Sequence, residues 1–110
     1  MDARSEVRYR TLKYYADGHV AEKGIDVQIA LEFVQQAAAA SKVPGNLVIL
    51  AAHDTDQEPS LEMATRLAPG QVETAGWRGA KRLMVNGRTT WHTALDEEHF
   101  ERCRDLKEYR

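Results

Sequence analysis

The spacing of hydrophobic positions predicts two helices in the first two thirds of the chain. From Asp26 to Ala40 the apolar residues recur three and four positions apart, as on one stripe of an amphipathic helix. Pro44-Gly45 ends this pattern. A shorter stripe from Leu61 to Ala68 follows Pro59, which is well placed for a helix start, and Pro69-Gly70 closes it. We therefore expect one long and one short helix.

Other segments have the composition of strands. Leu47 to Ala52 is an unbroken apolar run, typical of a strand buried on both faces of a parallel sheet. We expect it to be central and nearly inaccessible, with parallel neighbours, and covered by the helix that starts at Asp26. Glu6 to Tyr15 alternates and predicts a strand with one covered and one basic face. Gln71 to Trp77 resembles a further strand.

The last third of the chain predicts a hairpin and a short helix. Residues 82–85 and 88–92 flank Asn86-Gly87, a dipeptide that favours a tight hairpin turn. Asp96 and the two glutamates after it suit the first turn of a helix. Strands that alternate with helices indicate a single α/β domain over residues 1–110, with a mainly parallel sheet flanked by helices.

Composition and charge narrow the function classes. The 110 residues carry 15 Lys and Arg against 17 Asp and Glu, a net charge of −2, so bulk charge gives no case for a polybasic nucleic-acid or membrane binder. Cys103 is the single cysteine, which excludes an internal disulfide and a cysteine-based zinc cluster. The first residues do not resemble a secretory signal, and the longest apolar run is far too short to span a membrane. We expect a cytoplasmic protein with no membrane contact.

Acidic residues mark the first candidate site. Asp54 and Asp56 directly follow the predicted buried strand, where ligands bind in open α/β sheets, and Asp26 begins the long helix. Clustered carboxylates suit a hard divalent cation such as Mg²⁺ or Mn²⁺, which can activate water against a phosphate. On spacing alone, helix capping is the commoner role of an Asp-Thr-Asp loop. The spacing also does not determine whether Asp26 lies near the other two.

The motifs around these residues resemble the NYN domain family of PIN-like nucleases. The similar segments are Lys23-Gly-Ile-Asp-Val27, the helix after it, and Val48-Ile-Leu-Ala-Ala-His-Asp-Thr-Asp-Gln-Glu-Pro59. The resemblance runs from about Tyr9 to Trp77. It implies that Asp26, Asp54 and Asp56 bind Mg²⁺ or Mn²⁺ and are the catalytic residues of a ribonuclease that hydrolyses RNA phosphodiester bonds. It also implies that Lys23 contacts a phosphate.

Three departures from the family pattern open a second hypothesis. The family's first strand, which ends in an Asp, has no counterpart here, and His53 and Gln57 replace a small and an apolar residue. The chain thus resembles a PIN-like domain truncated at its N-terminal side, whether as a fragment, a short form, or a domain that completes its site with another chain. The alternative to a nuclease is a catalytically inactive RNA-binding or protein-assembly module of the NYN fold.

Basic and aromatic residues suggest where RNA and a second copy would bind. Arg78, Lys81 and Arg82 follow the third predicted strand, with Trp77 and Trp91 nearby, and they are candidate substrate-binding residues. Solvated charges and two core tryptophans are the commoner explanation of such residues. Because a missing strand would leave part of the sheet uncovered, we also expect a homodimer or partner chain to cover the segment near Tyr9 to Tyr15 or the sheet beside it.

Overall fold

The centre of the molecule is a parallel sheet of three strands. The computed structural model describes residues 6–9, 11–22 and 24–107. Strands β3 (Val48–Ala51), β4 (Val72–Trp77) and β7 (Trp91–Leu95) lie in the order β3-β4-β7, and both pairings are parallel. β4 is therefore the central strand. The α/β class and the parallel sheet predicted from the sequence are confirmed.

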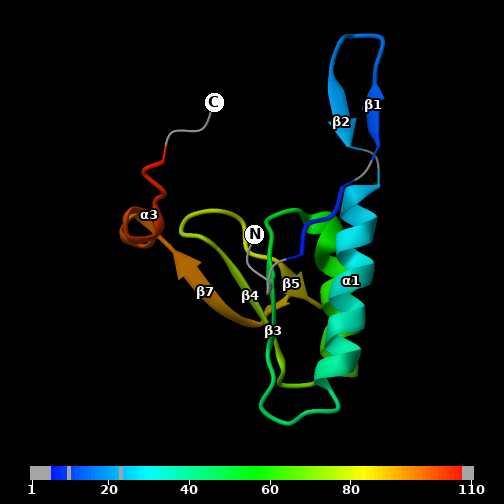
Figure 1. The fold of residues 1–110 in the computed structure, drawn as a ribbon. Coiled ribbons are helices and arrows are strands. Elements are labelled where there is room, and N and C mark those ends of the chain that lie inside the picture. Colours follow the sequence, from blue (N-terminus) through cyan, green and yellow to red (C-terminus); the bar gives the residue numbers. More distant parts are fainter. Residues whose placement is uncertain (1–5, 10, 23, 108–110) are drawn as a thin grey trace.

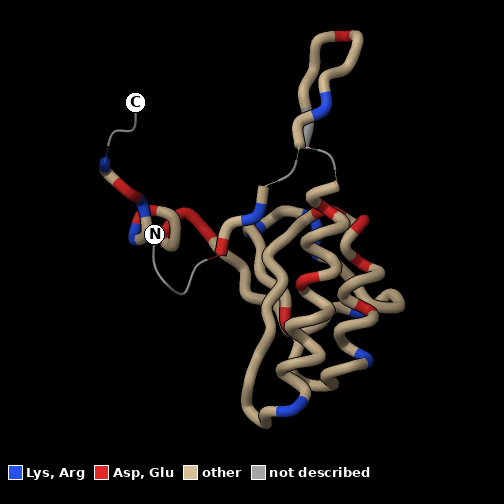
Figure 2. Tube along the Cα trace, turned by 45° about the vertical axis from the view of Figure 1, so that its right-hand side comes forward, with Lys and Arg blue, Asp and Glu red and all other residues tan. Residues whose placement is uncertain are grey.

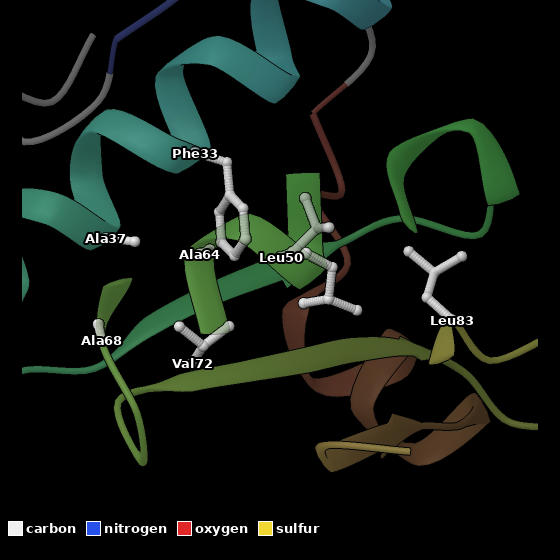
Figure 3. Packing of buried hydrophobic residues seen from close by; sticks show 8 residues of the cluster. Phe33, Ala37, Leu50, Ala64, Ala68, Val72 and Leu83 are labelled. Atoms are coloured by element: carbon white, nitrogen blue, oxygen red, sulfur yellow. The ribbon is translucent and has the colours of Figure 1, made fainter. Parts of the chain in front are cut away.

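Two helices cover one face of this sheet (Figure 1). They are α1 (Ile25–Ala40) and α2 (Glu58–Leu67), and a short 3-10 helix, η1 (Thr55–Gln57), leads into α2. Apolar side chains from α1, from α2 and its C-cap, from β3 and β4, and from the residue before β5 form the core beneath them (Figure 3). Its buried members are Phe33, Ala37, Leu50, Leu61, Ala64, Ala68, Val72 and Leu83. Both predicted helices are thus confirmed, and α1 covers the strand that it was expected to cover.

The remaining elements are two small hairpins and a third helix. β1 (Leu12–Tyr14) pairs antiparallel with β2 (Val20–Glu22), away from the main sheet. β5 (Met84–Val85) and β6 (Arg88–Thr89) pair about Asn86-Gly87, where both residues have positive φ, as the sequence predicted. Helix α3 (Glu97–Cys103) follows β7 and begins at Asp96.

The expectation that Leu47 to Ala52 forms a central, nearly inaccessible strand is wrong. Among the described residues β3 pairs with β4 alone and is an edge strand. Leu50 is 5% exposed beneath the helices, whereas Ile49, on the opposite face, is 54% exposed. An apolar run gives no alternation, so its composition cannot tell burial on both faces from burial on one.

The strand expected from Glu6 to Tyr15 is also corrected. Only Leu12–Tyr14 is a strand, and all of its residues are exposed, so it has no covered face. Of the arginines of the expected basic face, Arg10 lies outside the described residues. Arg8 lies before the strand and forms an ion pair with Glu32 on α1.

Candidate nucleic-acid interface

The acidic loop after β3 is organised as a helix cap. The carboxylate of Asp54 accepts a hydrogen bond from the backbone N–H of Asp56, at 2.9 Å, and so starts η1. This is the capping role that Asp commonly has at the beginning of a helix. One oxygen of Asp54 is therefore engaged inside its own loop.

Asp26 and Asp56 lie on one hollow between α1 and η1. The hollow has a volume of about 360 Å³ and is also lined by Gly24, Val27 and Gln57, among others. The side-chain amide of Gln57, which is buried, donates to the backbone carbonyl of Asp26 at 2.8 Å. This bond holds the start of α1 against η1, a proximity that the sequence pattern did not determine.

The three aspartates expected to bind a metal do not all line this hollow. Asp54 is absent from the lining of that hollow. Within residues 6–9, 11–22 and 24–107, no three His, Cys, Asp or Glu side chains are grouped closely enough to hold one metal ion. Lys23, the expected phosphate contact, lies outside the described residues. The metal and catalytic roles of Asp26, Asp54 and Asp56 stay predictions.

The sheet face opposite α1 and α2 carries two exposed tryptophans. The register pairs Glu73 with Trp91 and Trp77 with Leu95, so both indoles belong to the same face. Trp77 is 49% exposed and Trp91 is 73% exposed. Ile49 from β3 shares this face, which we call the open face. Neither tryptophan is a core residue, contrary to the commoner explanation of such residues.

The two tryptophans stand in different hollows, each with arginine nearby. Trp77 lines an apolar hollow of about 460 Å³ against Phe100 of α3, and Arg104 lies at its edge. Trp91 lines a second hollow of about 650 Å³ together with Arg88 and Asn86. Since Trp77 lies beside Leu95, four residues along β7 from Trp91, the backbone positions of the two tryptophans are offset by about 13 Å along the strand.

The predicted basic residues lie on the turn after β4 and on the segment that follows it. The backbone N–H of Arg78 donates to the Leu95 carbonyl at 2.7 Å, and its guanidinium lies 3.6 Å from Asp96. The side chains of Arg78, Lys81 and Arg82 are all exposed. Arg82 donates to the backbone carbonyl of Thr90 at 3.4 Å, which ties the segment before β5 to the start of β7. Arg78 and Lys81 therefore lie on the turn that directly follows Trp77, at the end of β4.

The helical layer and the segment after β4 differ in charge (Figure 2). From Gly24 to Leu67, which contains α1 and α2, the sequence has six Asp and Glu against two cations, Lys42 and Arg66. From Arg78 to Lys107 it has seven Lys and Arg against five Asp and Glu. A polyanion is therefore repelled from the helical layer and tolerated around the ends of the open face.

Two groups near the interface have shifted pKa values. The pKa of Asp96 is lowered, first by the hydrogen bond that it accepts from the backbone N–H of His99 and then by the His99 side chain. Burial lowers the pKa of His92, and the charge of Arg82 acts in the same direction. A neutral His92 also forms a 2.8 Å hydrogen bond with the buried hydroxyl of Thr74.

Strand β7 carries the part of the site that the sequence analysis missed. Trp91, Thr93 and Leu95 alternate with His92 and Ala94, a period of two that is typical of a strand. The hairpin predicted over residues 88–92 is therefore correct only for Arg88–Thr89, because Trp91 and His92 begin β7. Without β7 in the sheet, the shared face of Trp77 and Trp91 could not be deduced.

Comparison of the chain with protein-family models, with curated proteins and with solved structures found no match. Among the described residues, no helix has both the length and the apolar character needed to cross a membrane.

Proposed function

We propose that this protein binds single-stranded RNA on the open face of its sheet, as a binding module that does not depend on catalysis. The observation that carries the proposal is the pair of exposed indoles, Trp77 and Trp91, on one face. An indole left in water costs free energy that burial would recover, so two on one face suggest a partner. Bases stack on aromatic side chains whatever their sequence, because every base has a π-face.

The charged groups around the indoles support a nucleic acid as that partner. Arg78 and Arg104 lie near Trp77, and Arg88 lies near Trp91. Arginine binds phosphate oxygens in a bidentate way, and unpaired bases can spread to reach separate stacking sites. The resemblance to the NYN family, which acts on RNA, favours RNA over DNA.

Binding of a fluorescein-labelled single-stranded RNA, followed by anisotropy at low salt, tests the proposal. Stacking on an aromatic side chain is worth about 1–3 kcal/mol per base, so Trp77→Ala and Trp91→Ala should each weaken the Kd by about fivefold to a hundredfold. Ile49→Ala is the matched control, because Ile49 is exposed on the same face and has no ring. Wild-type protein without measurable binding, or tryptophan variants that bind like wild type, would refute it.

A second candidate function is metal-dependent hydrolysis of RNA at the hollow between α1 and η1. It is favoured by Asp26 and Asp56, whose helices are tied together by Gln57 so that both residues line one hollow. Carboxylate oxygens are the ligands that Mg²⁺ and Mn²⁺ prefer, and such an ion would activate water for attack on phosphorus.

Thermal melting with Mn²⁺ tests this candidate separately from RNA binding. A metal that binds only the folded chain stabilises it by about 1.4 kcal/mol at tenfold excess over Kd. Asp56→Asn should remove that shift and any Mn²⁺-dependent RNA cleavage, whereas Glu97→Gln, on the exposed side of α3, should not. If millimolar Mn²⁺ leaves the melting curve of the wild type unmoved, the hydrolytic candidate fails and the binding module stands.

A further inference from the structure

His53 joins the end of β3 to the turn after β4 through both of its ring nitrogens. Nε2 accepts a hydrogen bond from the backbone N–H of Trp77 at 3.0 Å. Nδ1 lies 2.9 Å from the backbone carbonyl oxygen of Lys81. A backbone N–H can only donate and a carbonyl can only accept, so Nε2 is unprotonated and Nδ1 carries the hydrogen. The two bonds together require the neutral ring.

Gly76 provides the space in which this ring lies. Gly76 is buried, and a Cβ built on it would collide with Cε1 of His53 and lie 3.0 Å from Nε2. Its φ is not positive, so the glycine is needed for its missing side chain and not for its backbone conformation. The imidazole and the glycine therefore form one fitted pair.

The bonds of His53 fix the backbone that carries the basic end of the open face. They hold Trp77 and Lys81, which are four residues apart, and the turn between them is closed by the Ala80 N–H donating to the Trp77 carbonyl at 3.1 Å. Arg78 lies inside this turn. Movement of His53 would therefore displace an indole and two cations together.

We propose that His53 is the positioning residue of the RNA-binding face, and that the two hydrogen bonds of its ring hold Trp77 and the turn to Lys81 in the arrangement that binds RNA. The proposal rests on the RNA-binding function proposed above. A side chain without an acceptor for the Trp77 N–H and a donor for the Lys81 carbonyl would leave both backbone groups without this partner. Loss of the imidazole therefore releases one stacking site and its two basic neighbours.

RNA affinity, measured by anisotropy, tests the proposal with two variants of His53. His53→Ala should bind at least fivefold more weakly than the wild type, the loss expected from one stacking site. His53→Gln keeps one acceptor and one donor, so it should retain the affinity of the wild type.

A second measurement needs no RNA. Hydrogen exchange at the Trp77 amide should be slow in the wild type and in His53→Gln, and fast in His53→Ala and Gly76→Ala. His19→Gln, on the exposed hairpin between β1 and β2, is the control and should change neither RNA affinity nor Trp77 exchange. Equal RNA affinity for the wild type and His53→Ala, or equal Trp77 exchange in these two proteins, would overturn the proposal. If RNA fails to bind the wild type at all, the RNA-binding function fails, and the exchange data alone decide the role of His53 in the fold.

Discussion

Single residues of this chain take roles that depend on which side of a strand they occupy. Trp77 follows Gly76 in β4: the glycine side receives the ring of His53, and the next side chain emerges on the open face. Trp91 has the same relation to His92, whose ring faces inward to Thr74. The polar rings of His53 and His92 thus lie on the interior side of the sheet, and the apolar indoles of Trp77 and Trp91 are exposed to solvent. Because apolar rings are ordinarily the buried ones, this arrangement is the basis for proposing a binding surface.

Arg78 is expected to contribute to binding through charge. For a single strand, each neutralised phosphate changes the slope of log K against log salt by about 0.7. Arg78→Gln should therefore make that slope shallower by about 0.7, measured by anisotropy over a salt series. Arg66→Gln removes an equal charge on α2, where Arg66 pairs with Glu62, and should leave the slope unchanged. Equal slopes for Arg78→Gln and the wild type would exclude a phosphate contact by this guanidinium.

Among the elements, α3 depends most on a single cap. Asp96 accepts from the backbone N–H of His99, and the Asp96 N–H lies 3.2 Å from Nδ1 of His99, which together make a capping box. The helix has seven residues and no buried side chain, so the cap matters more than packing. Since Phe100 of α3 lines the Trp77 hollow, this cap also shapes the open face.

Loss of the Asp96 carboxylate should loosen α3 locally. The pKa of Asp96 is below its ordinary value, so the unfolded chain takes up the proton first, and the stabilising effect is present above about pH 4 and lost as the pH falls through the lowered pKa. Asp96→Ala should lose amide protection in α3 at neutral pH, and the wild type should lose it on acidification. Asp96→Asn, which keeps an acceptor oxygen, should be protected at both. Protection in Asp96→Ala equal to that of the wild type would contradict the role of the cap.

The elements that the sequence predicted well are those with a clear period. The stripes of α1 and α2, the start of α2 at Pro59 and the turn at Asn86-Gly87 each have a local physical cause. The position of β3 within the sheet does not, because strand order depends on long-range pairing that no local pattern contains. The same limit applies to the candidate site: Gln57 brings Asp26 toward Asp56 through a bond between residues 31 positions apart.

Among the described residues, no strand covers the outer edge of β3, which makes it the least protected feature of the molecule. From Leu47 to Ala52 it has no charge and no proline, the usual devices that prevent edge pairing. Antiparallel pairing with a second copy would place the start of one strand, near Lys42, beside the end of the other, near Asp54 and Asp56. The charges at the two ends are therefore complementary, and we expect a homodimer through this edge. Pairing near Tyr9 to Tyr15 or the sheet beside it also stays a prediction.

Light scattering tests this expectation. The wild type should be dimeric at high micromolar concentration, and Ile49→Lys, a charge on the exposed side of the edge strand, should shift it toward monomer. Thr93→Lys places the same charge on an exposed position of β7 and should leave the dimer intact. A wild type that stays monomeric at that concentration would contradict pairing through β3.

Binding of single-stranded RNA to the open face can be observed directly in the indole N–H signals of ¹⁵N-labelled protein. The chain has two tryptophans, so its spectrum has two such signals, and the Trp77→Ala and Trp91→Ala variants assign them. Titration with an unlabelled single-stranded RNA should move both indole signals along one saturation curve, with little change at amides on the outer surfaces of α1 and α2. Indole signals that stay in place while RNA is in excess, or shifts confined to the two helices, would contradict the account.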